Sequence, residues 1–276
     1  MRFVRHIYQS KKAQDGEYGP HFNDQELIQT SLENLCKAWA RYLQGHIEQT
    51  GRLFGEPAFP WLDNERAIVS TLSAAIVRGF RKSLVLEECR LKKPGRYSSQ
   101  ESNKSSDAGR CDLWASIPEN EASCIPFSFY LEAKKSVTPK TSLTLSDYLN
   151  TDRGISRLFN DYLKSNPGKI RKRSPYQSLK DRIHPHYVIG MLVMPLKRTK
   201  SDLKDAALFA KIDDALSNVF EKGHAVKIKG SSEGSESERR RRLGRYPTVA
   251  LILAPENDQT GMIATFTVFG ATKEFL

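Results

Sequence analysis

The chain has 276 residues, a length that can bury a substantial core in a single domain. Lysine and arginine total 43 against 32 aspartate and glutamate residues, and the resulting net charge of +11 favours a polyanion partner such as nucleic acid. The longest apolar runs are too short for a membrane-spanning helix and the N-terminus lacks a secretory signal, so we expect a soluble cytoplasmic protein with no membrane partner.

The first part of the sequence predicts a long helix after a short polar arm. Residues 1–22 are mixed and polar and form the expected arm. Residues 24–49 carry an apolar stripe at helical spacing, made of Leu27, Ile28, Leu32, Leu35, Trp39, Leu43 and Ile47. Such a stripe is more often core than partner surface, so we expect this helix to pack on the rest of the domain. Residues 51–62, which contain proline and glycine, are typical of a linker.

A second helix and three strands are expected next. Asp63 is the expected N-cap of a helix that ends near residue 80, with an apolar stripe of Ile68, Val69, Leu72, Ile76 and Phe80. Short apolar stretches then predict strands at residues 83–91, 111–117 and 125–134. Residues 92–109 are rich in serine, glycine and charge, so we expect a long loop between the first two strands.

The remaining sequence predicts two helices and three more strands. The helices are expected at residues 145–163 and 202–220, and the strands at residues 187–194, 248–254 and 262–269. The last two strands form a predicted β-hairpin that extends the sheet. Residues 230–245, a Gly-Ser-Glu stretch followed by four arginines, are expected to be a disordered loop.

Asp112 and the sequence Glu132-Ala133-Lys134 carry the most information about function. Each lies in a short apolar stretch that predicts a strand. Because side chains alternate between the two faces of a strand, Glu132 and Lys134 project from the same face, roughly 7 Å apart. Pairing the two strands can bring Asp112 beside Glu132, although the sequence leaves the register open.

These residue types suit a divalent metal site. Mg²⁺ prefers oxygen ligands and takes one or two protein carboxylates, so Asp112 and Glu132 are candidate ligands and the backbone carbonyl of Ala133 can add a third. Mn²⁺ fits the same set. The metal would acidify a bound water and neutralise charge on a phosphate. Lys134 can orient or help deprotonate that water, or pair with the phosphate, and the sequence does not choose between these tasks. The simpler alternative is a solvated strand, because surface strands carry Glu and Lys for solubility.

These residues and the order of the elements resemble the PD-(D/E)xK, or restriction-endonuclease-like, nucleases. The resemblance covers residues 63–194, and it departs from the family pattern at Cys111, where the family name implies proline. It implies one α/β domain over residues 1–276 with a mixed central β-sheet flanked by α-helices. Residues 1–62 would form a helical extension, residues 63–194 the nuclease core, and residues 195–276 a helix and the hairpin that extends the sheet.

Three further glutamates lie near the expected site. Many nucleases of the resembled family carry a glutamate on the first helix that helps to bind metal, and Glu65 matches that position. Alternatively, Glu65 only stabilises the helix dipole from the first turn. Glu87 and Glu88 lie on the preceding strand, where one of them can approach the site, but edge-strand charges are the simpler interpretation.

Two basic segments are candidate phosphate contacts. The first, within residues 164–200, includes Lys169, Arg171, Lys172, Arg173 and Tyr176, and the tyrosine can stack on a base or sugar. The second is the run Arg239, Arg240, Arg241 and Arg242, which can grip the phosphate backbone or only keep a loop soluble.

Several other classes of site are disfavoured. The sequence contains no glycine-rich phosphate loop and no Gly-x-Ser-x-Gly elbow, which argues against nucleotide-driven chemistry and against a serine hydrolase of that fold. The four cysteines form no CxxC pair, so a zinc site or a disulfide framework is not expected.

Together these features predict a Mg²⁺-dependent deoxyribonuclease of the endonuclease type, and the resemblance implies a role in restriction, defence against foreign DNA, or DNA repair. Asp112, Glu132 and Lys134 are its expected catalytic residues, with Glu65 as a fourth. A homodimer is an open arrangement, since double-strand cutters often need two sites. A separate targeting protein is a second open arrangement. The alternatives are a non-catalytic nucleic-acid-binding protein on a degenerate nuclease fold and an enzyme that cuts RNA.

Overall fold

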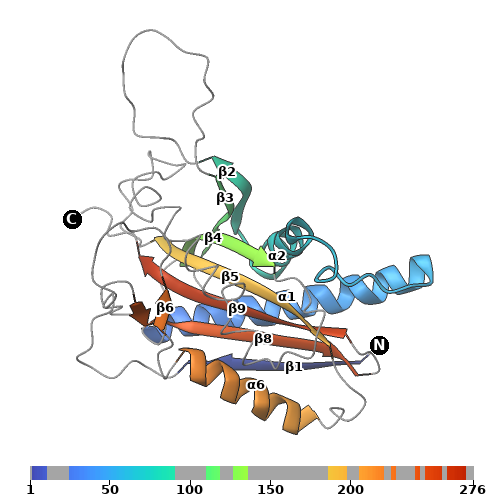
Figure 1. The fold of residues 1–276 in the computed structure, drawn as a ribbon. Helices are drawn as coiled ribbons and strands as arrows, with labels where there is room; N and C mark the ends of the chain where they lie inside the picture. Colours follow the sequence, from blue (N-terminus) through green and yellow to red (C-terminus); the bar gives the residue numbers. More distant parts are fainter. Residues whose placement is uncertain are drawn as a thin grey trace, which may run out of the picture.

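A seven-stranded mixed β-sheet forms the centre of the protein in this computed structural model (Figure 1). The structure describes residues 2–10, 25–90, 110–118, 127–135, 186–197, 205–220, 225–227, 240–242, 246–256 and 260–271. The α/β fold class expected from the sequence is therefore confirmed.

The sheet has the strand order β1-β8-β9-β5-β4-β3-β2. In that order the strands are Phe3–Gln9, Thr248–Pro255, Thr260–Ala271, His186–Lys197, Phe127–Lys135, Arg110–Ile117 and Leu84–Arg90. Neighbours pair antiparallel except β4 and β5, which are parallel. The central strands are almost continuously apolar because both of their faces are buried, as the burial of every β8 residue illustrates.

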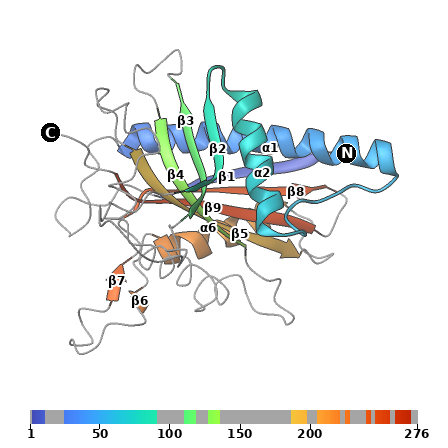
Figure 2. The same ribbon diagram turned by 90° about the horizontal axis from the view of Figure 1, so that it is seen from above.

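Two helices cover one face of the sheet (Figure 2). They are α1, Gln25–Phe54, and α2, Glu65–Gly79, and their buried side chains share one core with alternate residues of the strands. Trp39 joins these layers, since its ring packs edge-on against Phe266 of β9 and its indole N–H donates to Thr71 Oγ1 of α2 at 3.1 Å.

The helix α6, Asp205–Phe220, lies on the opposite face of the sheet, beside β1 (Figure 2). In β1, Phe3 and Ile7 pack against the core under α1, whereas His6 points to the other face. There the His6 ring stacks on Phe209 and its Nε2 contacts the Asp213 carboxylate at 2.9 Å. The sheet is thus held between helices on both faces, as in a three-layer α/β arrangement.

Most expected elements are confirmed within a few residues of their predicted bounds. The helices predicted at residues 24–49, 63–80 and 202–220 correspond to α1, α2 and α6. The strands predicted at residues 83–91, 111–117, 125–134, 187–194, 248–254 and 262–269 correspond to β2, β3, β4, β5, β8 and β9. The helix predicted at residues 145–163 and the loop predicted at residues 92–109 lie outside the described residues.

Three expectations at the N-terminal side are wrong. The predicted polar arm contains the strand β1, whose partner β8 is so distant in sequence that no local pattern indicates the pairing. The helix α1 continues to Phe54 through part of the predicted linker. The N-cap of α2 is Asn64 rather than Asp63, because the Asn64 side chain accepts from the Ala67 N–H at 2.9 Å.

The predicted disordered loop at residues 230–245 is also partly wrong. The strand β7, Arg240–Arg242, pairs antiparallel with β6, Ala225–Lys227, in a separate two-stranded sheet. Backbone pairing across a chain reversal therefore orders part of the arginine run, which composition alone did not indicate.

We expect Leu72→Ala to lower the free energy of unfolding by about 2–5 kcal/mol, because Leu72 is fully buried between α1 and α2 and its loss leaves a cavity. Val77→Ala, at an exposed position of the same helix, is the matched control and should change stability by less than about 0.5 kcal/mol. Urea unfolding of both variants measures the difference, and equal losses would contradict this packing.

Candidate functional site

The four residues expected to form the site come together where β3, β4 and the start of α2 meet. Leu113 of β3 pairs with Leu131 of β4, so the next position on each strand places Asp112 opposite Glu132. The register that the sequence left open therefore sets the two carboxylates side by side. Both strands place these polar side chains on the face away from Leu113 and Leu131, which are completely buried under the helices.

Asp112 is fixed by the backbone of β4. Its Oδ2 accepts a hydrogen bond from the Ala133 N–H at 2.7 Å. A backbone donor is far less mobile than a side chain, so this bond holds the carboxylate in one place. Only one of the two carboxylate oxygens takes part in it, and Oδ1 remains as a donor atom for a metal ion.

Lys134 connects the other groups of the site. Its Nζ donates to Glu132 Oε1 at 2.9 Å and to the carbonyl oxygen of Ala133 at 2.8 Å. The same ammonium lies 3.5 Å from Glu65 Oε1. The Lys134 and Glu132 side chains are 22% and 23% exposed, so water screens this pair less than it screens a surface ion pair.

Glu65 is the first residue of α2, and it attaches the helix to the end of β4. Its Oε2 accepts from the Lys135 N–H at 3.2 Å while Oε1 faces Lys134. The Lys135 ammonium in turn donates to the carbonyl oxygens of Leu62 and Asp63, just before the helix. Glu65 thus makes specific contacts with β4 in addition to any effect on the helix dipole.

The site concentrates negative charge in a partly buried place. Burial raises the pKa of Asp112, although the bond from Ala133 and the charge of Lys134 oppose the shift. Burial and then repulsion from Asp112 raise the pKa of Glu132, again against the attraction of Lys134. Burial lowers the pKa of Lys134, but the neighbouring carboxylates, Glu132 first, outweigh it and leave that pKa raised. A cation is therefore favoured between these carboxylates.

Glu87 and Glu88 lie on β2, the edge strand, and both contact α2. Ser70 Oγ donates to Glu87 Oε2 at 3.1 Å, and Arg66 Nη2 lies 2.9 Å from Glu88 Oε1. Glu88 has a φ of 49°, in the left-handed region that costs a non-glycine residue roughly 1–2 kcal/mol. Its charge also contributes to the raised pKa of Asp112. The sequence offers no signal for this backbone conformation.

The carboxylate and carbonyl oxygens of the site match part of a ligand set for Mg²⁺. Within the described part of the chain, no three His, Cys, Asp or Glu side chains are placed to form a complete metal-binding group. Two carboxylates, from Asp112 and Glu132, and the carbonyl of Ala133 form a smaller set. That set suits Mg²⁺, which keeps several water ligands. The Lys134 ammonium already bonds two of these three groups, so the place accommodates a cation.

The described residues include none of the side chains expected to contact nucleic acid. Lys169, Arg171, Lys172, Arg173, Tyr176 and Arg239 lie outside the described residues, and Arg240, Arg241 and Arg242 are described only as the backbone of β7. Among the described residues, Cys36 and Cys111 are buried and form no disulfide. Among the helices described, none is long and apolar enough to cross a bilayer.

Comparisons of the chain with protein-family models, with curated proteins and with solved structures find no match. Function must therefore be argued from the geometry of Asp112, Glu132, Lys134 and Glu65.

Proposed function

We propose that this chain is a metal-dependent nuclease that hydrolyses DNA phosphodiester bonds at the site formed by Asp112, Glu132, Lys134 and Glu65. The observation that carries the proposal is the set of contacts around Lys134. One ammonium bonds Glu132 and approaches Glu65, while the intervening Ala133 fixes Asp112 through its backbone N–H. These charges converge from two strands and a helix, as the groups of a catalytic site do.

The order of elements around the site supports the same proposal. The helix α2 is followed by the antiparallel meander β2-β3-β4, and β5 lies parallel to β4 in the same sheet. This is the order that the resemblance to restriction-endonuclease-like nucleases implied. The proposal includes a restriction-endonuclease-like fold and a role in restriction, defence or repair.

The proposal gives a role to each residue of the site. Asp112, Glu132 and the Ala133 carbonyl would hold Mg²⁺ or Mn²⁺, and Glu65 would complete the site or position Lys134. The bound metal would acidify a water molecule and neutralise charge that builds on the phosphate. Without a metal, the neighbouring carboxylates raise the pKa of Lys134. A cation bound by the same carboxylates would oppose that shift, so Lys134 would either orient or help deprotonate the attacking water, or pair with the phosphate.

The charge of the chain supports a nucleic-acid substrate that is held through its phosphate backbone, and it does not distinguish DNA from RNA. The net charge of +11 favours binding to phosphate backbones, and such contacts carry no sequence information. An RNA-cutting enzyme would use the same carboxylates. A second copy of the chain would supply the second cut in a duplex, and a separate protein partner would supply targeting.

We expect the purified chain to cut plasmid and linear DNA in Mg²⁺ or Mn²⁺ and to leave both intact in EDTA. Matched DNA and RNA oligonucleotides of one sequence identify the preferred sugar. Cleavage in EDTA equal to that in Mg²⁺ would contradict the metal requirement.

A non-catalytic nucleic-acid-binding protein is the second candidate. It is favoured by one observation, that Lys134 already neutralises part of the charge that a metal would neutralise. In that case the folded chain binds DNA in a salt-dependent way in Mg²⁺ and in Mn²⁺ but cuts nothing.

A further inference from the structure

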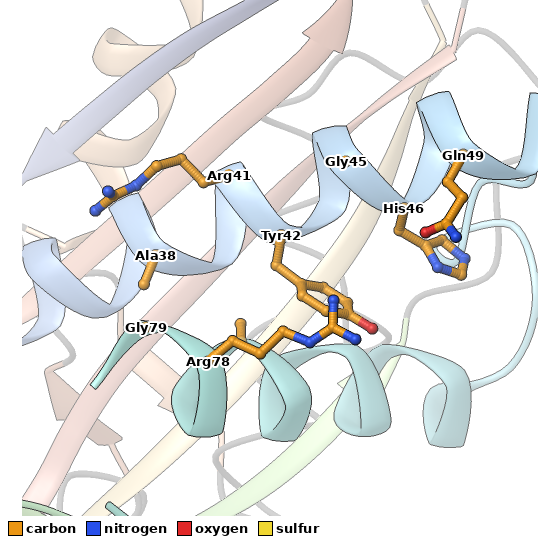
Figure 3. Close-up of a pocket in the computed structure, with 9 residues that line it drawn as sticks. Ala38, Arg41, Tyr42, Gly45, His46, Gln49, Arg78 and Gly79 are labelled. Atoms are coloured by element: carbon orange, nitrogen blue, oxygen red, sulfur yellow. The ribbon is translucent and has the colours of Figure 1, made fainter. Parts of the chain in front are cut away.

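A groove of about 390 Å³ lies between α1 and α2, away from the candidate nuclease site (Figure 3). Its α1 side is formed by residues on successive turns of one helix face, including Tyr42, Gly45, His46 and Gln49. Arg78 comes from the last turn of α2. Glu65 and Arg78 lie near opposite ends of this helix, ~20 Å apart at about 1.5 Å per residue. The groove and the candidate site are therefore separate places.

The groove is basic. Among the described residues that line it there is no carboxylate, whereas Arg78, Arg41 and His46 are present. The Arg78 guanidinium lies over the Tyr42 ring, with its carbon 5.2 Å from the ring centroid, and His46 stacks on the other end of the same tyrosine at 6.2 Å. Tyr42 therefore contacts the exposed Arg78 side chain at the groove, and His46 and Gln49 lie further along α1 (Figure 3).

The polar groups of the groove are available to a ligand. Among the described residues, Arg78, His46 and Gln49 have no hydrogen-bond or ion-pair partner. Arg41 differs, since its side chain extends along α1 away from them and donates to the Lys37 carbonyl at 3.3 Å. Arginine, imidazole N–H and amide N–H groups that converge in a concave place are donors suited to phosphate oxygens.

Gly45 lies on the α1 side of the groove, at an exposed position. Glycine inside a helix is unfavourable relative to alanine, so a packing reason would be expected for it. Gly79 has such a reason, because a Cβ there would lie 3.0 Å from the Ala38 Cβ and would push α1 and α2 apart. At Gly45 an added Cβ would meet no atom within 4 Å. Position 45 therefore has room for a side chain on the α1 side of the groove.

We propose that this groove binds the phosphate group of a nucleotide or of a nucleic-acid backbone, with Arg78 as the principal contact and His46 and Gln49 as further donors. The two sources share the same chemistry. Binding of this kind needs neither a divalent metal nor Lys134, so it does not depend on the proposed nuclease activity.

Calorimetric titration of the full chain in EDTA tests the proposal, with ADP, adenosine and a short single-stranded DNA oligonucleotide as probes. We expect ADP to bind at least 10-fold more tightly than adenosine, and Arg78→Gln to weaken ADP binding by at least 10-fold. If ADP does not bind, the oligonucleotide should bind and lose affinity in Arg78→Gln, which identifies the backbone as the source of the phosphate.

Two substitutions at Gly45 separate the effect of charge on ligand binding from the effect of side-chain volume. Gly45→Glu and Gly45→Gln fill the groove equally and both favour the helix, so both proteins should fold and melt at or above the wild-type temperature. Gly45→Glu should weaken binding by at least 10-fold more than Gly45→Gln, because only it places a carboxylate near Arg78. Adenosine binding as tight as ADP binding, or affinities for both phosphate probes that neither Arg78→Gln nor Gly45→Glu changes, would overturn the proposal.

Discussion

Lys134→Met is expected to lower the rate of DNA cleavage by about 10²–10⁴-fold, the range typical of a positioned proton donor or acceptor. Its ammonium bonds Glu132 and the Ala133 carbonyl, and no other lysine or arginine side chain described contacts Glu132. Methionine fills similar space without the charge. Lys134→Arg keeps the charge but not the compact ammonium, so it should recover only part of the rate.

The control for this substitution is Lys37→Met. Lys37 also pairs with a glutamate, Glu33, but on the exposed surface of α1, and its loss should leave cleavage unchanged. Because Lys134→Met leaves neighbouring carboxylates without their cation, we expect it to lose about 1–3 kcal/mol of stability at pH 8. Rates must therefore be compared well below the melting temperature of the variant. Equal rates of DNA cleavage by Lys134→Met and Lys37→Met would show that Lys134 takes no part in the reaction.

Asp112→Asn is expected to stabilise the fold at pH 8 while it abolishes cleavage. The raised pKa of Asp112 means that the folded chain holds this proton more tightly than the unfolded chain does. The stability that the protonated form contributes is thus present below the unfolded pKa and lost as the pH rises through the folded pKa. Asparagine stays neutral and can still accept from the Ala133 N–H, so the gain at pH 8 should be on the order of 1 kcal/mol.

Thermal or urea unfolding from pH 4 to pH 8 measures this difference. The stabilisation should shrink as the pH falls, because the raised pKa of Asp112 lets the folded wild type take up this proton more readily than the unfolded chain does. Asp214→Asn, an exposed site on α6, should change stability little at any of these pH values. A variant less stable than the wild type at pH 8 would show that the Asp112 charge is well compensated and would contradict this account.

The same variant also reports on metal binding. Mg²⁺ at 100 times its Kd would stabilise the wild type by about 2.7 kcal/mol, and this gain should be lost in Asp112→Asn. The substitution would then raise stability without metal and remove the response to metal. Such a trade is expected where like charges are held together for function rather than for folding.

The sequence predicted those elements whose pattern is local and strong. The period-2 alternation in β4 assigns Glu132 and Lys134 to one face without any knowledge of the partner strands. The apolar stripe of α2 likewise places Glu65 at its first turn. The candidate residues could therefore be named from the sequence, together with the elements that carry them.

The contacts that turn these residues into a site depend on distant pairing. The Asp112–Glu132 juxtaposition needs the register of β3 on β4, and the Lys134–Glu65 contact joins residues of a helix and a strand with the whole meander between them. The edge strand β1 escaped prediction for the same reason, since it pairs with β8 at the other end of the chain. Strand pairing at such separations leaves no local periodic signal.

Two further features could be identified only from the three-dimensional structure. The left-handed conformation of Glu88 has no sequence signature, because the residue is not glycine or asparagine. The groove exists only because α1 packs on α2, which brings Arg78 of α2 to the Tyr42 ring of α1. The open space around Gly45 is likewise visible only in the packed structure. From the sequence alone these residues belong to two unrelated amphipathic helices.

Single-turnover cleavage of an end-labelled DNA duplex, by wild type and Glu132→Gln in Mg²⁺ and in EDTA, tests the central claim most directly. Glutamine keeps the size of Glu132 but removes a charged metal ligand next to Lys134. The account predicts Mg²⁺-dependent cutting by the wild type, and a folded Glu132→Gln protein that binds the duplex but does not cut it. Equal cutting by both proteins, or a folded wild type that binds the duplex and cuts nothing in Mg²⁺ or Mn²⁺, would contradict it.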